Sequence, residues 1–146
     1  RAAVPLLFGA EHLAAVALRA RNQFAENAKT LATFEEVPEA THNTVVTLED
    51  HGGVEQVGIG FDSPLLSIAN RRRLEITCRL FEERGLAFKM VPLSGESLLA
   101  DMMEATAFTD FVSCYLAIIR GLDPTPTANL TRMRTAVAGA AAPLAS

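Results

Sequence analysis

Short apolar runs alternate along the chain with longer stretches in which apolar residues recur every three or four positions. The short runs are bounded by glycine, proline or polar turn residues, a pattern that predicts buried strands. They span residues 4–8, 54–61 and 87–91. Residues 11–29 and 64–84 are rich in helix formers and predict two helices, of which Gly85 ends the second.

Residues that favour helix starts precede the later helices. The D-S-P segment at residues 62–64 predicts an N-cap with proline near the first helical position, and the S-G-E segment at 94–96 predicts another. From Leu98 to Ile119 apolar residues recur at i, i+3 and i+4. This apolar face is wide, so we expect the third helix to be mostly buried, and Gly121 predicts its end.

A D-P-T-P turn at residues 123–126 predicts the start of a last helix, with Pro126 at its first position. Strands that alternate with helices pair in parallel through right-handed crossovers. The pattern therefore predicts an α/β fold, a three-layer αβα sandwich around a mostly parallel sheet. We expect one domain over residues 1–140 and a frayed tail over residues 141–146.

Ligands of such folds bind outside the carboxyl ends of the strands, so three loops are candidate binding positions. These loops follow Phe8, Phe61 and Val91. Two of them lead into helix starts that could favour an anion, but helix capping alone explains the same polar residues. Gly58 and Gly60 do not complete a nucleotide-binding motif.

Composition narrows the class of partner. The chain has 146 residues, of which 49% are hydrophobic, and a formal net charge of −4, which argues against nucleic acid. No apolar run approaches the roughly 20 residues that a membrane span needs, and the N-terminus lacks the basic-then-apolar arrangement of a secretory signal. We expect a cytoplasmic protein without a membrane partner. Cys78 and Cys114 have no metal-ligand spacing, so no metal site is predicted.

Two segments carry candidate chemistry. R-N-Q-F-A-E-N-A-K places Glu26 near a helix end, where the helix dipole favours a cation instead. E-V-P-E-A-T-H-N ends a loop with His42 and Asn43. Without further information, Glu26 is explained as a solvated surface glutamate and His42 as a loop histidine with a structural hydrogen bond.

These segments are followed by G-x-S-L-L at residues 95–99 and by D-F-V-S-C-Y-L-A-I-I-R-G-L-D-P-T-P at residues 110–126. In this order they resemble the C-terminal half of the bifunctional phosphoglucose/phosphomannose isomerases, from about Val4 to about Ala138. That family consists of two-domain proteins of the sugar isomerase (SIS) superfamily, whose domains are flavodoxin-like. The chain begins at Arg1 without a methionine, as a piece of a longer protein would.

The resemblance implies an activity and its partners. The substrate would be a sugar phosphate, glucose 6-phosphate or mannose 6-phosphate converted to fructose 6-phosphate, with no metal or organic cofactor. The active enzyme would be a homodimer whose subunits each add an N-terminal SIS domain. The serines and threonines that hold the phosphate in that domain, and an arginine that stabilises the enediolate, lie outside this chain. We therefore expect this chain alone to be inactive.

The resemblance also implies roles for single residues. Glu26 matches the family's catalytic base, which moves a proton between C1 and C2 through a cis-enediol. His42 matches the histidine that opens the sugar ring in the active site of the partner subunit. Arg134 stands where the family has a catalytic lysine; it keeps the positive charge but is a poor proton donor because it is always protonated.

Four neighbouring residues complete the implied substrate site: Asn27, Lys29, Thr41 and Asn43. We infer that the first two orient the helix end that carries the glutamate; a surface position for Lys29 is the alternative. Thr41 stands where the family motif has asparagine, which keeps a hydrogen-bonding group but changes its reach.

Two other hypotheses about function stay open. The first is a non-catalytic SIS module that binds a phosphosugar as a regulatory signal, which Arg134 favours and which Glu26 together with His42 disfavours. The second treats the domain mainly as a dimerisation half, which is compatible with either function. Fold resemblance cannot choose among them, because function resides in the site.

Overall fold

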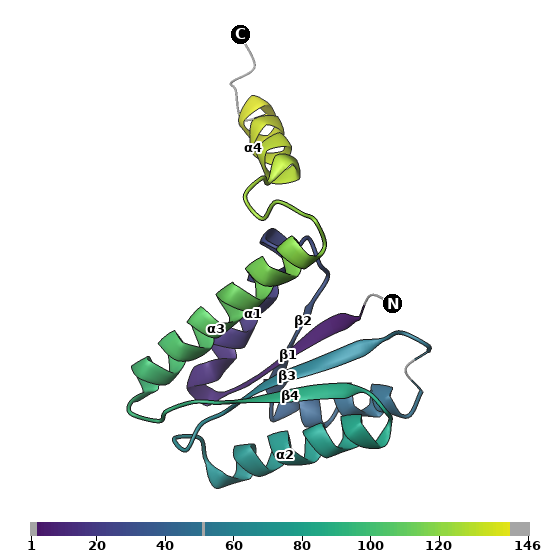
Figure 1. The fold of residues 1–146 in the computed structure, drawn as a ribbon, viewed down its shortest axis with the longest axis vertical. Helices are drawn as coiled ribbons and strands as arrows, with labels where there is room; N and C mark the ends of the chain where they lie inside the picture. Colours follow the sequence, from purple (N-terminus) through teal and green to yellow (C-terminus); the bar gives the residue numbers. More distant parts are fainter. Residues whose placement is uncertain (1–2, 51, 141–146) are drawn as a thin grey trace.

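A four-stranded parallel sheet with strand order β2-β1-β3-β4 forms the centre of the domain (Figure 1). The computed structural model describes residues 3–50 and 52–140, so the predicted frayed tail lies outside the described residues. The strands are β1 (Val4–Ala10), β2 (Thr33–Val37), β3 (Gln56–Asp62) and β4 (Ala87–Pro92). All three pairings are parallel, as strand–helix alternation predicts.

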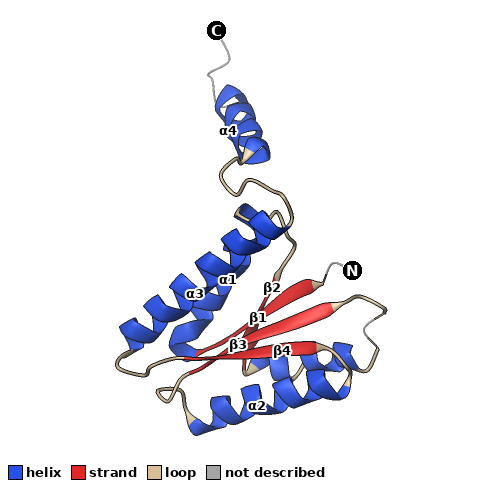
Figure 2. Cartoon of the chain, in the orientation of Figure 1, coloured by secondary structure: helices blue, strands red, loops and turns tan. Residues whose placement is uncertain are grey.

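Helices cover both faces of the sheet and produce the predicted three-layer sandwich (Figure 2). On one face lie α1 (Ala14–Glu26), which follows the short turn η1 (Glu11–Leu13), and α3 (Leu98–Ile119). On the other face lie α2 (Ile68–Glu83) and two 3₁₀ turns, η2 (Glu39–Thr41) and η3 (Thr44–Leu48). The last helix, α4 (Ala128–Ala140), extends away from these layers.

β2 is a strand that the sequence analysis missed. Its sequence, T-F-E-E-V, lacks an apolar run because it lies at the edge of the sheet and is only half-buried. Its register is set by β1, where Thr33 stands opposite Leu6 and Val37 opposite Ala10. An edge strand with one covered face needs few apolar residues, so an apolar-run criterion does not detect it.

The helix boundaries also differ from the prediction. The second helix begins at Ile68, capped by Ser67, and not near Pro64. The Ser63 hydroxyl instead belongs to the turn before the helix, where it accepts from the Leu65 amide at 3.0 Å and donates to Asp101 of α3. The cap of α3 is Ser97 and not the 94–96 segment. The first helix ends at Glu26 instead of residue 29, and the last begins at Ala128 instead of residue 126.

Three phenylalanines fill the space between the sheet and α2. Phe8, Phe81 and Phe88 lie with ring centroids 5.2–5.9 Å apart. A Cβ atom at Gly58 would lie 2.1 Å from the Phe88 ring, and one at Gly60 would lie 3.1 Å from it. The two glycines of β3 therefore make room for an aromatic ring, which explains a spacing that resembles part of a nucleotide-binding motif.

The third helix is packed with its small residues inward. The buried residues recur every fourth position, on the side of α3 that packs against η1 and α1: Asp101, Ala105, Thr109, Ser113 and Ala117. Many large apolar residues point outward, including Phe111 at 62% exposure and Ile119 at 82%. The prediction of a mostly buried α3 was therefore wrong.

By length and composition alone, α3 is also apolar enough to cross a membrane, contrary to the sequence-based expectation. This is weak support for a membrane span, because helices packed inside folded domains pass the same test. In this structure one face of α3 packs along α1.

The aromatic cluster provides a stability test. We expect Phe81→Ala to lower the free energy of unfolding by about 3–5 kcal/mol, because Phe81 is fully buried and the change leaves a cavity. Phe111→Ala is the matched control on the outer face of α3 and should cost less than about 1 kcal/mol in the isolated chain. Urea unfolding followed by circular dichroism measures both, and equal losses would contradict this packing.

Candidate active site

Glu26 is the last residue of α1 and is exposed. Because α1 returns from the end of β1 to the start of the parallel strand β2, its last turn lies near the amino-terminal ends of the strands. Lys29 and Thr30, just beyond it, border the same cavity as Pro5 at the start of β1. The glutamate is therefore not at the carboxyl edge, where the sequence analysis looked for ligands.

The end of α1 is held by hydrogen bonds from the Lys29 and Asn27 side chains. Lys29, at φ 52°, donates from its ammonium nitrogen to the carbonyl oxygen of Glu26 at 2.5 Å and to that of Pro124 at 3.1 Å. The Asn27 side-chain nitrogen, Nδ2, donates to the Ser113 hydroxyl of α3 at 2.8 Å. Both residues thus fix the helix end and leave the Glu26 carboxylate exposed.

Arg120, at the end of α3, adds a further connection. It donates to the carbonyl oxygen of Ala28 at 2.8 Å and to the Thr30 hydroxyl. The sequence analysis did not single out Arg120 or Ser113. A sequence signal for both was present. Ser113 and Arg120 belong to the 110–126 segment, and because they are seven residues apart they lie on the same side of a helix.

His42 lies in a different part of the domain, between η2 and η3, and is exposed. Its neighbours stabilise the turn: the Thr41 hydroxyl donates to the Pro38 carbonyl at 2.6 Å, and the Asn43 amide donates to Glu39 at 3.2 Å. The turns η2 and η3 belong to the α2 side of the sheet, whereas α1 lies on the opposite side (Figure 2). One chain therefore does not bring Glu26 and His42 together.

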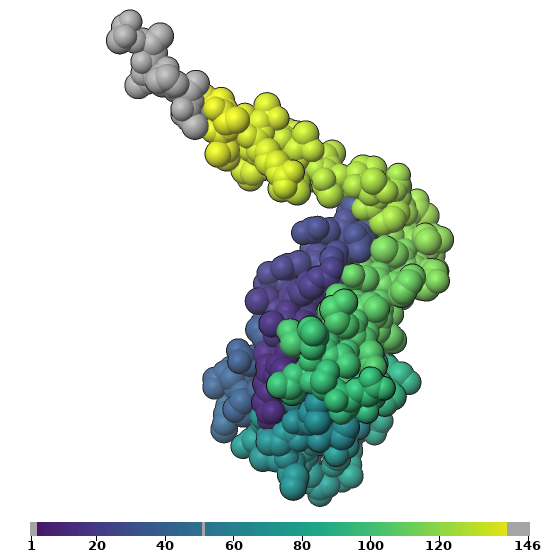
Figure 3. Space-filling model, turned by 90° about the vertical axis from the view of Figure 1, so that its left-hand side faces the viewer, coloured from purple at the N-terminus to yellow at the C-terminus, as the bar shows by residue number. Residues whose placement is uncertain are grey.

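Arg134 is separated from both. It lies on α4, where every residue from 128 to 139 is exposed. Figure 3 shows α4 extending away from the rest of the chain. The three candidate catalytic residues thus lie at three separate places, and the described chain contains no assembled active site.

The carboxyl edge of the sheet is occupied by the chain's own carboxylates. The Glu11 carboxylate accepts hydrogen bonds from the Ser67 amide at 3.1 Å and from the Asn70 side chain at 2.8 Å, at the start of α2. Hydrogen bonding from the Ser67 side chain is the largest cause that lowers the pKa of Glu11, and the bonds from Asn70 and from the Ser67 amide act in the same direction. A helix start that could favour an external anion is therefore already satisfied.

Asp101 closes the same edge from inside and is fully buried. Its carboxylate accepts hydrogen bonds from the Ser63 hydroxyl, from the Gly95 amide at 2.8 Å and from the His12 ring at 3.3 Å. Burial by itself would raise the pKa of Asp101, but the hydrogen bonds outweigh it and the pKa is lowered. This carboxylate therefore connects η1, the two loops after β3 and β4, and α3.

Metal ligation finds no support in the described part of the chain. Residues 3–50 and 52–140 contain no group of three or more His, Cys, Asp or Glu side chains that could hold a metal ion. Cys78 and Cys114 are both free.

An open parallel sheet with helices on both faces defines an α/β domain. Residues 1–137 match the model of the bacterial phospho-glucose isomerase C-terminal SIS domain, and the chain belongs to this family.

Two curated relatives are named bifunctional phosphoglucose/phosphomannose isomerase. That of Thermoplasma acidophilum is 35% identical over 122 residues, which cover 83% of this chain and 38% of the relative. That of Thermoplasma volcanium is 30% identical over 136 residues, which cover 92% of this chain and 43% of the relative. The chain thus spans less than half the length of either relative.

Solved structures show the same fold. A glucose-6-phosphate isomerase like protein from Thermus thermophilus matches with a TM-score of 0.71 at 23% identity, over 91% of this chain and 43% of that chain. A hypothetical protein from the same organism matches with a TM-score of 0.75 at 12% identity, over 94% of this chain and 41% of that chain. These identities support the fold alone.

The buried Asp101 carboxylate makes the free energy of unfolding depend on pH. Because the pKa of Asp101 is lower in the folded state than the unfolded value of about 3.9, the ionised group stabilises the fold above that value. This contribution is lost as the pH falls through the folded pKa. We expect Asp101→Asn to destabilise the domain by about 1–3 kcal/mol at pH 7, because hydrogen-bond donors lose their charged acceptor.

Urea unfolding at pH 7 and at pH 3 measures this effect. The difference between wild type and Asp101→Asn should shrink at the lower pH. Asp123→Asn, at an exposed turn carboxylate, is the control. An equal difference at both pH values would refute the role given to the ionised carboxylate.

Proposed function

We propose that this chain is the C-terminal domain of a sugar-phosphate aldose–ketose isomerase that interconverts glucose 6-phosphate or mannose 6-phosphate with fructose 6-phosphate. The observation that carries the proposal is the family membership, together with the fixed helix end that presents Glu26. A carboxylate held in the open is suited to take a proton from C2 of an open-chain aldose and to return it to C1. No metal or organic cofactor enters this reaction.

Lys29 and Asn27 support this role through the backbone. Their hydrogen bonds fix the last turn of α1 against α3 and against the 123–126 turn, so the direction in which Glu26 leaves the helix is restricted. General base catalysis depends on such positioning, because the carboxylate must meet the carbon acid within hydrogen-bond reach. We therefore treat Lys29 and Asn27 as positioning residues.

His42 acts, in this proposal, in the active site of a second copy. Within one chain it lies on the opposite side of the sheet from Glu26, and its turn is exposed. A twofold dimer can join two such distant residues, because the surface of one subunit faces that of the other. An imidazole near neutral pH can transfer a proton to the sugar-ring oxygen.

The outer face of α3 supports further domain contacts. Phe111 and Tyr115 stack there with centroids 6.1 Å apart, and Ile118 and Ile119 further along the helix are also exposed. An exposed apolar surface of this kind commonly marks an interface. We propose that an N-terminal SIS domain and the second subunit cover it, and that α4 docks in the same assembly and brings Arg134 towards the substrate. The cytoplasm is the proposed location.

A non-catalytic phosphosugar-binding module is the second candidate. The observation that favours it is Arg134 in place of a lysine, since a guanidinium can hold a phosphate or an enediolate oxygen but is a poor proton donor. Loss of turnover with retained sugar-phosphate binding separates this function from the first.

The base is tested in the longer protein that carries this domain together with an N-terminal SIS domain. With fructose 6-phosphate as substrate, we expect Glu26→Gln to lower kcat by about 10²–10⁴-fold, because the amide cannot accept the proton. Glu83→Gln is the matched control, an exposed glutamate at the end of another helix. Arg134→Lys should retain or increase turnover.

Two results would contradict isomerase chemistry at this site. Turnover that survives Glu26→Gln would remove the proposed base. Absence of any turnover in the wild type, combined with a melting temperature that rises on adding glucose 6-phosphate, would select the binding module.

Action across the dimer is tested by mixing two inactive variants of the same longer protein. Glu26→Gln and His42→Asn subunits, unfolded and refolded together, should recover about a quarter of the wild-type activity, since half of the random dimers are mixed and each contains one intact site. Each variant refolded alone is the control. Light scattering that shows a monomer at micromolar concentration, or a mixture without recovered activity, would refute this arrangement.

A further inference from the structure

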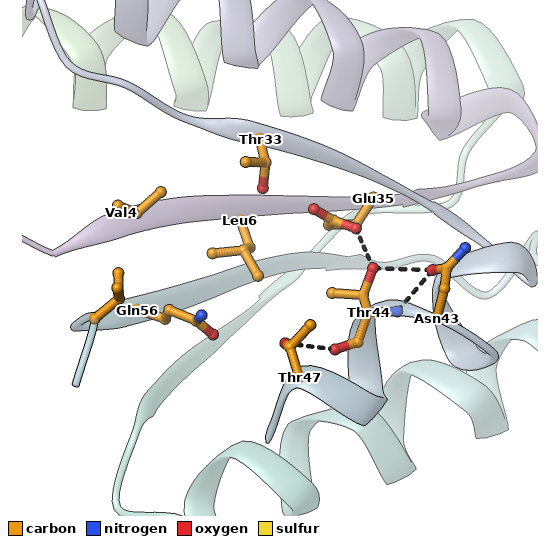
Figure 4. A pocket seen from close by; sticks show the side chains of 9 residues that line it. Val4, Leu6, Thr33, Glu35, Asn43, Thr44, Thr47 and Gln56 are labelled. Atoms are coloured by element: carbon orange, nitrogen blue, oxygen red, sulfur yellow. Dashed lines mark hydrogen bonds between the residues drawn. The ribbon is translucent and has the colours of Figure 1, made fainter. Parts of the chain in front are cut away.

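A second hollow lies beside the loop that carries His42, on the α2 side of the sheet (Figure 4). It has a volume of about 360 Å³ and is bounded by β1, β2, β3 and η3. We call it the β2 pocket. Its volume is at the lower end of the roughly 300–1,000 Å³ typical of small-molecule sites, so it can hold a compact ligand.

Two polar atoms in the β2 pocket are buried without a partner. The Thr33 hydroxyl oxygen and the Gln56 side-chain oxygen have no hydrogen-bond partner within the described residues, although both are shielded from solvent. Among the described residues, these are the two buried side-chain polar atoms without a hydrogen-bond partner, and both residues line the β2 pocket. Buried polar groups without partners are costly, so their convergence indicates a group that completes them.

The remaining polar lining defines the chemistry of that group. Glu35 accepts a hydrogen bond from the Thr44 hydroxyl but has further lone pairs to offer, and Gln56 presents an unused acceptor. The pocket therefore offers more acceptors than donors, and an O–H-rich molecule matches it. The Glu35 carboxylate disfavours a phosphate, because like charges repel at close range.

The apolar part of the lining is equally informative. Val4 and Leu6 of β1 form part of the wall next to these acceptors, as Figure 4 shows. Sugars and sugar alcohols combine hydroxyl groups with apolar C–H surfaces, so they match both parts of the lining. We propose that the β2 pocket binds a small uncharged polyhydroxy compound, a sugar or a sugar alcohol, through Thr33, Glu35 and Gln56.

Binding there is coupled to the His42 loop. Asn43 and Thr44, which directly follow the histidine, both line the pocket, and Thr44 is the hydrogen-bond partner of Glu35. A hydroxyl that donates to Glu35 changes the position of Thr44 and thereby of the turn before it. The effect of this coupling on turnover rests on the function proposed for His42, whereas binding itself does not.

The test is a titration of the 146-residue chain, followed through its backbone amide NMR signals, with mannitol, with mannose and with inorganic phosphate as separate probes. We expect saturable shifts from mannitol or mannose that centre on Thr44, Thr47 and Gln56 and extend to His42. Phosphate should produce no saturable shift at these residues. The readout needs no isomerase activity, so its result is independent of the proposed catalysis.

A double variant provides the decisive comparison. Thr33→Val with Gln56→Met keeps side-chain size but removes both unpaired atoms, so it should weaken mannitol or mannose binding at least tenfold. The fold should be retained, because no hydrogen bond is lost; if the double variant does not fold, each single variant carries the same expectation. Thr131→Val on α4 is the control, since its hydroxyl donates to the Thr127 carbonyl oxygen at 3.4 Å and Thr131 does not line the pocket.

Three results would overturn the proposal. The first is the absence of saturable shifts with both polyhydroxy probes. The second is binding that the double variant leaves unchanged. The third is phosphate binding at the same residues. Saturable binding without any shift at His42 would overturn the coupling to the loop.

Discussion

Close packing of α3 along α1 is the contact on which the rest of this domain depends. The residues of α3 that face α1 are small or polar, so the two helices can approach closely, and Asp101 fixes the start of α3 to the carboxyl edge of the sheet. The same orientation aims Ser113 and Arg120 at the end of α1. It also leaves Phe111, Tyr115, Ile118 and Ile119 of α3 exposed, and exposed apolar surface of this kind commonly marks an interface.

This arrangement divides the candidate chemistry among separate surfaces. Glu26 is presented at the amino end of the sheet on the α1 side, His42 belongs to turns on the α2 side, and Arg134 lies on a helix outside the sandwich. The carboxyl edge, where open α/β sheets usually bind ligands, is closed by Glu11 and Asp101. In the proposed isomerase, a domain with this distribution would supply parts of an active site, and an assembly would have to bring them together.

Sequence reasoning recovered the α/β class, three of the four strands and the order of the helices, because apolar runs and helical periodicity are local properties. It failed at β2, whose T-F-E-E-V sequence forms a strand through pairing with β1. It also failed to predict how much of α3 stays exposed: Met102, Val112 and Leu116 pack against the core, but large apolar residues such as Phe111 and Ile119 do not. Periodicity shows that a helix has an apolar side, but not which partner buries it.

The sequence by itself determined the family of the chain and the candidates Glu26 and His42, because ordered motifs identify a family without knowledge of their contacts. Only the tertiary structure decided that Lys29 and Asn27 face backbone and α3, that Gly58 and Gly60 admit the Phe88 ring, and that Thr33 and Gln56 share one pocket. These relations join residues distant in the chain. They arise because parallel crossovers and side-chain packing, and not local sequence, decide which groups meet.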